Sequence, residues 1–164
     1  MFRALLLCLM ALLLSSCASM GQAPANPQLA QIDVELMTLE LQSQQTRMAR
    51  VHLLEAIHVA PQDPEVMIAQ GYFDESLGDT HAAMMAYQAG IAAAPHDPNV
   101  EDQYGSFLYR RGQYRQALSY FEKVAANPDN AASLEASENA ALTAQKLHDP
   151  QLAKQYFSKV KIGG

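Results

Sequence analysis

The feature that most constrains the fold of this 164-residue chain is a pattern that recurs at a fixed interval in the sequence. The segment 61–64 (PQDP) returns at 95–98 (PHDP), and two glycines are repeated with the same shift. Four alanines mark the whole series, although the last lies slightly beyond the regular position: Ala49, Ala83, Ala117 and Ala153. A period of about 34 residues is typical of small units that stack and bury a shared core. The repeat therefore predicts a solenoid.

Composition indicates that the repeated units are helical. The chain contains 27 alanines but only 16 valines, isoleucines and threonines in all. Alanine is the best helix former and β-branched residues favour strands, so the composition argues against an all-β fold. The formal charge of −6 argues against a nucleic-acid partner, because such a protein needs a basic face to neutralise phosphates.

The period and the residue types resemble the tetratricopeptide repeat (TPR), a helix–turn–helix unit of about 34 residues. In the second unit Gly71 occupies the small-residue site of the first helix, while Ala83, Tyr87 and Gly90 lie on one face of the second. The aromatic residue that usually starts a TPR unit is replaced in this chain by Asp33, Met67, Glu101 and Ser137. The resemblance implies an all-α fold, a short right-handed superhelix of about four helix pairs.

Local chemistry indicates where the helices begin and turn. Asp63, Asp97 and Asp149 each precede a proline, which suits a capping carboxylate followed by proline in the first helical turn. Gly78 and Gly112 lie inside the units, where a glycine accepts positive φ at a helix end. We expect a TPR domain over 28–162, with repeats at about 28–61, 64–95, 98–128 and 131–161. The corresponding helix pairs are expected over 28–59, 64–94, 98–126 and 131–161.

The N-terminus has the pattern of a signal sequence. Arg3 precedes an apolar run over 4–14, which is too short to cross a bilayer as a helix. The segment 14–17 (LSSC) resembles the bacterial lipobox. That resemblance implies a signal peptide over 1–16 that is cleaved, and a lipidated Cys17. An ordinary secretory signal with an incidental cysteine is the alternative.

Several acyl chains on Cys17 would anchor the protein firmly to a membrane. Ala18 follows the cysteine, and by resemblance to lipoprotein sorting rules this implies the periplasmic face of the outer membrane. Residues 17–27 are rich in small residues and proline, so we expect a flexible tether between the lipid and the TPR domain.

The TPR resemblance also implies a concave surface, lined by the exposed side of the first helix of each unit. The positions concerned include Gln31, Val34, Thr38, Leu41, Glu65, Ile68, Tyr72, Glu75, Asn99, Asp102, Ser106, Tyr109, Arg110, Glu135, Glu138, Leu142 and Gln145. This mixture of aromatic, aliphatic and acidic groups suits an extended or helical peptide. The partner-binding groove is assigned to Tyr72, Glu75, Asp102, Ser106, Tyr109, Arg110, Glu138 and Asn139. In the alternative interpretation, Tyr72 and Tyr109 pack between repeats.

Two segments resemble one particular family of TPR proteins. Residues 104–117 (YGSFLYRRGQYRQA) look like the "YG-x-FL … G-x-Y-x-x-A" stretch of the type IV pilus biogenesis/stability lipoproteins, the PilF/PilW family. Residues 134–141 (LEASENAA) are similar to the "ALENAG" segment of that family. The resemblance implies a pilotin, an outer-membrane TPR lipoprotein that helps the pilus secretin reach the outer membrane and multimerise.

Nothing in the sequence predicts an enzyme. The five histidines show no metal-ligand spacing, and no HExxH, G-x-S-x-G, P-loop or G-x-G-x-x-G motif occurs. The histidines are expected on solvated loops and helix surfaces: His52, His58, His81, His96 and His148. We expect no catalytic residue, metal, cofactor or small-molecule substrate. The alternative function is a TPR lipoprotein adaptor for another envelope assembly, such as β-barrel insertion or peptidoglycan enzymes.

Overall fold

The computed structural model describes residues 26–127 and 130–163, and every regular element in these ranges is a helix. The signal segment, Cys17 and most of the expected tether lie outside the described residues. The helices are α2 (Pro27–Gln42), α3 (Thr46–Val59), α4 (Pro64–Ser76), α5 (Thr80–Ala93), α6 (Pro98–Arg110), α7 (Tyr114–Ala125), α8 (Ser133–Lys146) and α9 (Pro150–Gly163).

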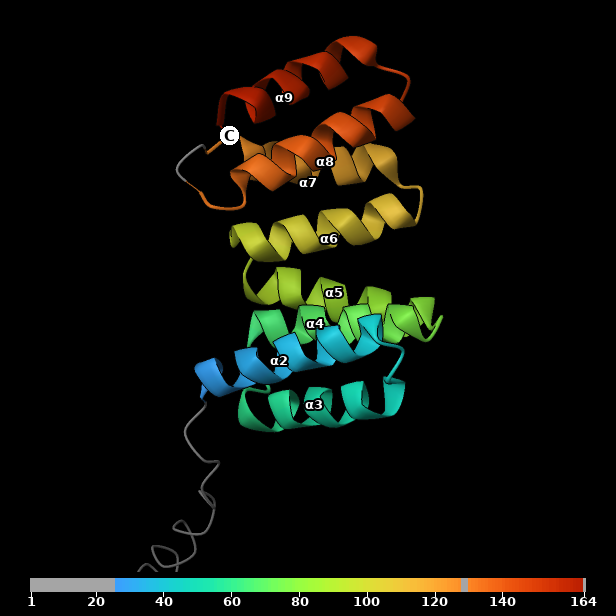
Figure 1. The fold of residues 1–164 in the computed structure, drawn as a ribbon, viewed down its shortest axis with the longest axis vertical. Coiled ribbons are helices and arrows are strands. Elements are labelled where there is room, and N and C mark those ends of the chain that lie inside the picture. Colours follow the sequence, from blue (N-terminus) through green and yellow to red (C-terminus); the bar gives the residue numbers. More distant parts are fainter. Residues whose placement is uncertain (1–25, 128–129, 164) are drawn as a thin grey trace, which may run out of the picture.

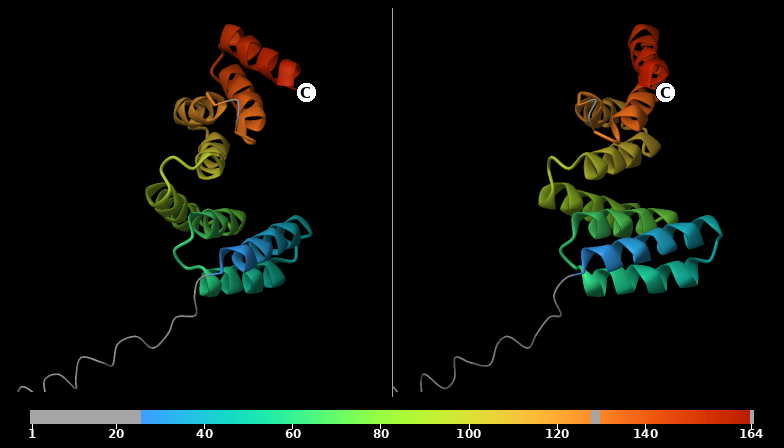
Figure 2. Two further views of the ribbon diagram at one scale, coloured as in Figure 1. Left: turned by 90° about the vertical axis from the view of Figure 1, so that its left-hand side faces the viewer. Right: turned by 60° about the vertical axis from the view of Figure 1, so that its left-hand side comes forward.

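These described helices form four pairs that stack along the long axis of the molecule, with α2 and α3 at one end and α9 at the other (Figure 1). Successive pairs are turned relative to one another, so that the stack is curved (Figure 2). The expected all-α TPR superhelix is confirmed.

The capping pattern in the sequence explains where the helices start. A carboxylate oxygen of Asp63 accepts the backbone N–H of Glu65 at 2.8 Å, and Asp97 and Asp149 cap α6 and α9 in the same way. Asn26 repeats this arrangement at α2, where its side-chain oxygen accepts the N–H of Leu29 at 3.2 Å. Pro27, expected in the tether, is therefore the first residue of α2.

The repeated small residues set the spacing of the helices. The four alanines of the repeated series are between 0% and 3% exposed. A Cβ atom at Gly71 would lie 2.8 Å from the Tyr87 ring, and one at Gly105 would lie 2.8 Å from the Phe121 ring. The two helices of the second and third pairs thus approach so closely that only glycine fits opposite the aromatic ring, as the resemblance implies for Gly71.

The turn inside each pair has a residue with a left-handed backbone conformation (positive φ) at the same position. This residue is Gly78 (φ +79°) in the second pair and Gly112 (φ +74°) in the third. In the first and fourth pairs the same turn is made by Gln44 and His148, each with a φ of 59°. A side chain at positive φ is strained by its own backbone, whereas glycine is not. The sequence predicts the two glycine turns but not the two strained ones.

We expect His148→Gly to raise the free energy of unfolding by about 1 kcal/mol, because glycine relieves the left-handed strain at this turn. The matched change Gly112→Ala should lower it by about the same amount. Urea denaturation followed by circular dichroism measures both. A loss of stability in the first variant, or a gain in the second, would contradict the assigned turn geometry.

Candidate partner-binding groove

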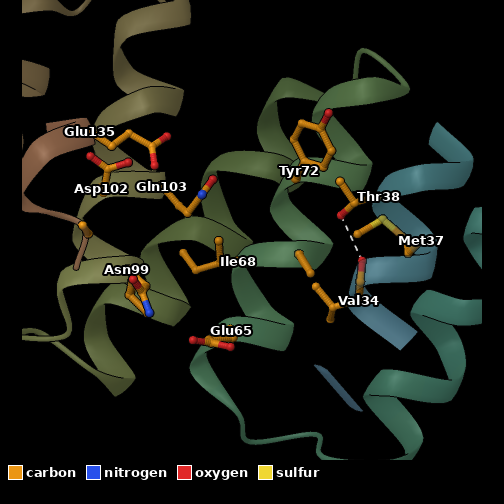
Figure 3. A pocket seen from close by; sticks show the side chains of 13 residues that line it. Val34, Met37, Thr38, Glu65, Ile68, Tyr72, Asn99, Asp102, Gln103 and Glu135 are labelled. Atoms are coloured by element: carbon orange, nitrogen blue, oxygen red, sulfur yellow. Dashed lines mark hydrogen bonds between the residues drawn. The ribbon is translucent and has the colours of Figure 1, made fainter. Parts of the chain in front are cut away.

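The first helices of all four pairs line one open groove with a volume of about 460 Å³ (Figure 3). Its walls are formed by Val34, Met37, Thr38, Glu65, Ile68, Ala69, Tyr72, Asn99, Val100, Asp102, Gln103, Ala132 and Glu135. Because α2, α4, α6 and the start of α8 all contribute, the groove exists only when the repeats are stacked.

The two sides of the groove differ in chemistry. Val34, Met37 and Ile68 form an apolar side near α2 and α4, whereas Asp102 and Glu135 lie toward α6 and α8 (Figure 3). Three of the described residues that line the groove are acidic, and none is lysine or arginine. The groove therefore suits a segment that combines aliphatic side chains with a positive charge.

Asp102 is the most unusual of these acids because its side chain is buried. The residue is 5% exposed, and its Oδ1 accepts a hydrogen bond from Asn139 Nδ2 at 3.4 Å. Burial raises the pKa of Asp102 to about 6, and the nearby Glu135 carboxylate acts in the same direction. The hydrogen bond from Asn139 opposes this shift without cancelling it. A partly desolvated carboxylate thus lies in the wall of the groove.

The raised pKa of Asp102 predicts a pH-dependent effect on stability. In the unfolded chain the carboxyl loses its proton near its ordinary pKa of 3.8, whereas the folded chain holds the proton up to about pH 6. Ionised Asp102 therefore destabilises the fold at neutral pH, and this destabilisation disappears as the pH falls from 6 to below 4. We expect Asp102→Asn, which can accept the same hydrogen bond, to raise stability by about 1–3 kcal/mol at about pH 7.5 and much less at about pH 4. Urea denaturation at the two pH values measures this, and a gain independent of pH would contradict it.

A second, smaller hollow of about 190 Å³ lies between α6, α7 and α8. Four of the residues assigned to partner binding meet there: Ser106, Tyr109, Arg110 and Asn139. The Tyr109 ring packs edge-on against Tyr114, with the ring centroids 5.3 Å apart. This contact lies within the third pair and not between repeats, and Tyr109 also lines the hollow, so its role in partner binding stays a prediction.

Glu75 and Arg110 bind each other rather than standing free in the groove. Arg110 donates from Nε to Glu75 Oε1 at 2.9 Å and from Nη2 to Oε2 at 2.8 Å, which is a bidentate pair between α4 and α6. The Tyr87 hydroxyl donates to the same carboxylate at 3.3 Å. These contacts tie the second pair to the third, and the role of Glu75 and Arg110 in partner binding stays a prediction.

The remaining assigned residues divide between the groove and the solvent. Tyr72 lines the groove and also packs against two buried clusters, and its role in partner binding stays a prediction. Glu138 is exposed and lines neither hollow. Ala69 and Gln103 line the groove although neither was expected there. They occupy the same position in successive repeats, so the period itself links them.

His52 differs from the expectation that all histidines are solvated. Its ring nitrogens lie 3.0 Å from an Asp33 oxygen and 3.5 Å from a Glu40 oxygen, between α2 and α3. In the part of the chain that the structure describes, no group of three or more histidine, cysteine or acidic residues could hold a metal ion. None of the described helices has the length and apolar character needed to cross a membrane.

Comparison with known proteins finds that the chain is similar to a type IV pilus assembly protein. It is 24% identical over 163 residues to the type IV pilus assembly protein PilF of Pseudomonas aeruginosa, an alignment covering 96% of this chain and 65% of PilF. An uncharacterized protein of Haemophilus influenzae is 23% identical over 148 residues, covering 90% of this chain and 83% of that protein. No family model matches the chain.

Solved structures show the same fold. The structure of P. aeruginosa PilF superposes with a TM-score of 0.74 at 22% identity, covering 84% of this chain and 62% of that one. The structure of PilW, a widely conserved type IV pilus biogenesis factor, gives 0.72 at 21% identity, covering 83% and 62%. MamA gives 0.62 at 17% identity, covering 84% and 80%. The chain thus spans less than two thirds of the length of PilF and PilW. It is a TPR relative of these type IV pilus factors, which it resembles in both sequence and fold.

Proposed function

We propose that the protein is a non-enzymatic, lipid-anchored TPR scaffold on the periplasmic face of the outer membrane that promotes type IV pilus biogenesis. In this proposal it binds the pilus secretin and aids its localisation and multimerisation. The observation that carries the proposal is the groove shared by all four helix pairs, in a chain whose relative PilF is a type IV pilus assembly protein. The TPR fold itself is suited to protein–protein contacts.

The chemistry of the groove limits which segment of the secretin could bind. The apolar side offers Val34 and the small exposed part of Ile68 to aliphatic side chains, whereas Met37, which also lines it, is fully buried. On the opposite side Asp102 is desolvated without a cation among the described lining residues, and a lysine or arginine from the partner would offset that cost. We expect the bound segment to carry at least one basic residue among aliphatic ones.

The lipid anchor has a separate role in the proposal. Cys17 would hold the protein at the membrane, while the domain that starts at Asn26 binds the partner. Loss of the lipid should therefore misplace the secretin without changing the groove. Loss of the groove should abolish the complex without changing the membrane attachment.

The proposal predicts that the double substitution Glu65→Lys, Glu135→Lys lowers the amount of secretin multimers several-fold. Both side chains are exposed and line the groove, so reversing their charge repels a basic partner without disturbing the core. A blot of outer-membrane fractions for heat- and detergent-resistant secretin multimers measures this. Glu55→Lys, at an exposed site on α3 outside the groove, is the matched control and should leave multimers unchanged.

Two further strains complete the same blot. Deletion of the gene should abolish the multimers, and Cys17→Ala should leave the protein present but the multimers misplaced. Unchanged multimers in the deletion strain would overturn the pilus assignment. Altered envelope permeability with normal piliation would instead favour an adaptor for another envelope assembly.

A further inference from the structure

The outer face of α2 exposes an apolar stripe that the concave groove does not use. Its four members, Leu29, Ile32, Leu36 and Leu39, are between 38% and 57% exposed. They are spaced three, four and three positions apart, which places them on one side of the helix, as in the seam of a coiled coil. Exposed apolar residues that line up in this way are typical of a helix-binding surface.

Two of the four positions are buried in the next two pairs. Ile32 and Leu39 each have counterparts in the second and third repeats. These counterparts are 2% exposed or less: Val66, Phe73, Val100 and Phe107. Ile32 and Leu39 therefore occupy positions that the repeat buries wherever another pair stacks on them.

The structure also identifies what covers this face in the second pair. Val66 packs in a cluster with Ala56 and Ala60, at the end of the preceding helix α3. Phe73 packs with Ala49 and Leu53 of the same helix. The face accepts an α-helix that presents small and aliphatic residues.

The charge of α2 indicates which kind of partner could cover the stripe. α2 contains three carboxylates, Asp33, Glu35 and Glu40, and neither lysine nor arginine. Asp33 and Glu40 contact His52 of α3, whereas Glu35 is exposed next to Leu36, at a flanking position of the kind that selects partners in coiled coils. A second copy of α2, or an anionic lipid surface, would bring like charges together there. In the second pair, by contrast, the Arg50 guanidinium of α3 lies 5.1 Å from the centre of the Phe73 ring that it covers.

We propose that the stripe on α2 docks a basic amphipathic helix of a partner protein, which takes the place that α3 takes on α4. None of the four stripe residues lines the concave groove, so the proposal does not depend on the identity of the partner bound there. The helix needs small or aliphatic residues on one face and arginine or lysine beside them.

The test uses a synthetic peptide with the sequence of α3, Thr46–Val59, which contains Arg47 and Arg50. The peptide is titrated into the ¹⁵N-labelled chain of residues 17–164, which contains every residue that the structure describes. Amide shifts along α2 should follow the titration. Leu39→Glu in the protein should weaken binding at least tenfold, and Arg47→Glu with Arg50→Glu in the peptide should do the same.

Leu54→Glu in the protein is the matched control. Leu54 is 59% exposed on α3, but its counterparts in the next pairs are the polar Gln88 and Glu122, so binding should be unchanged. Shifts confined to other helices, or equal weakening by Leu54→Glu and Leu39→Glu, would overturn the proposal. The proposal would also fail if the peptide did not bind and the stripe served another occupant. In that case Leu39→Glu would abolish dimerisation of the chain, or binding of the chain to phosphatidylglycerol vesicles.

Discussion

The packing of an aromatic ring against a glycine, in the second and third pairs, is the contact on which the rest of the structure depends. Tyr87 lies against Gly71 and so fixes how closely α4 and α5 approach. The same ring stacks on Phe107 of the next pair, with centroids 4.5 Å apart, and its hydroxyl donates to the Glu75 carboxylate that holds Arg110. A single side chain thus sets the geometry within a pair and also joins two pairs. Because the groove is assembled from helices of different pairs, its shape follows from these contacts.

The groove combines structural and binding demands on the same residues. Ile68 and Val100 line it and are at the same time part of the buried core, so its apolar side is held in place by packing. Asp102 is buried in the opposite wall at a cost in stability, because its charged form is poorly solvated there. A protein that retains such a carboxylate beside an open groove is expected to recover part of this cost when a cationic partner binds. The stripe on α2 follows the same principle, since apolar side chains are left exposed there beside the Glu35 carboxylate.

Most of the fold could be predicted because it is encoded locally and repeatedly. The alanine series, the Asp-Pro caps and the turn glycines each specify a feature that depends on neighbouring residues in the chain. Features that depend on contacts between helices could not be predicted in this way. The pair between Glu75 and Arg110 joins the ends of two helices, and His52 is held between two acids of the adjacent helix. The strained turn at His148 has no sequence signal, because this turn between α8 and α9 places at positive φ a residue that does not favour it.

The central claim is that the concave groove holds a segment of the pilus secretin, and photo-cross-linking in living cells tests it most directly. A benzophenone amino acid would replace Gln103, which is exposed and lines the groove, or Gln88, which is exposed on α5 and does not line it. Irradiation should join the secretin subunit to the protein carrying the probe at position 103 and not at position 88. Equal adducts at both positions, or an adduct at 103 with a different envelope protein only, would contradict the claim.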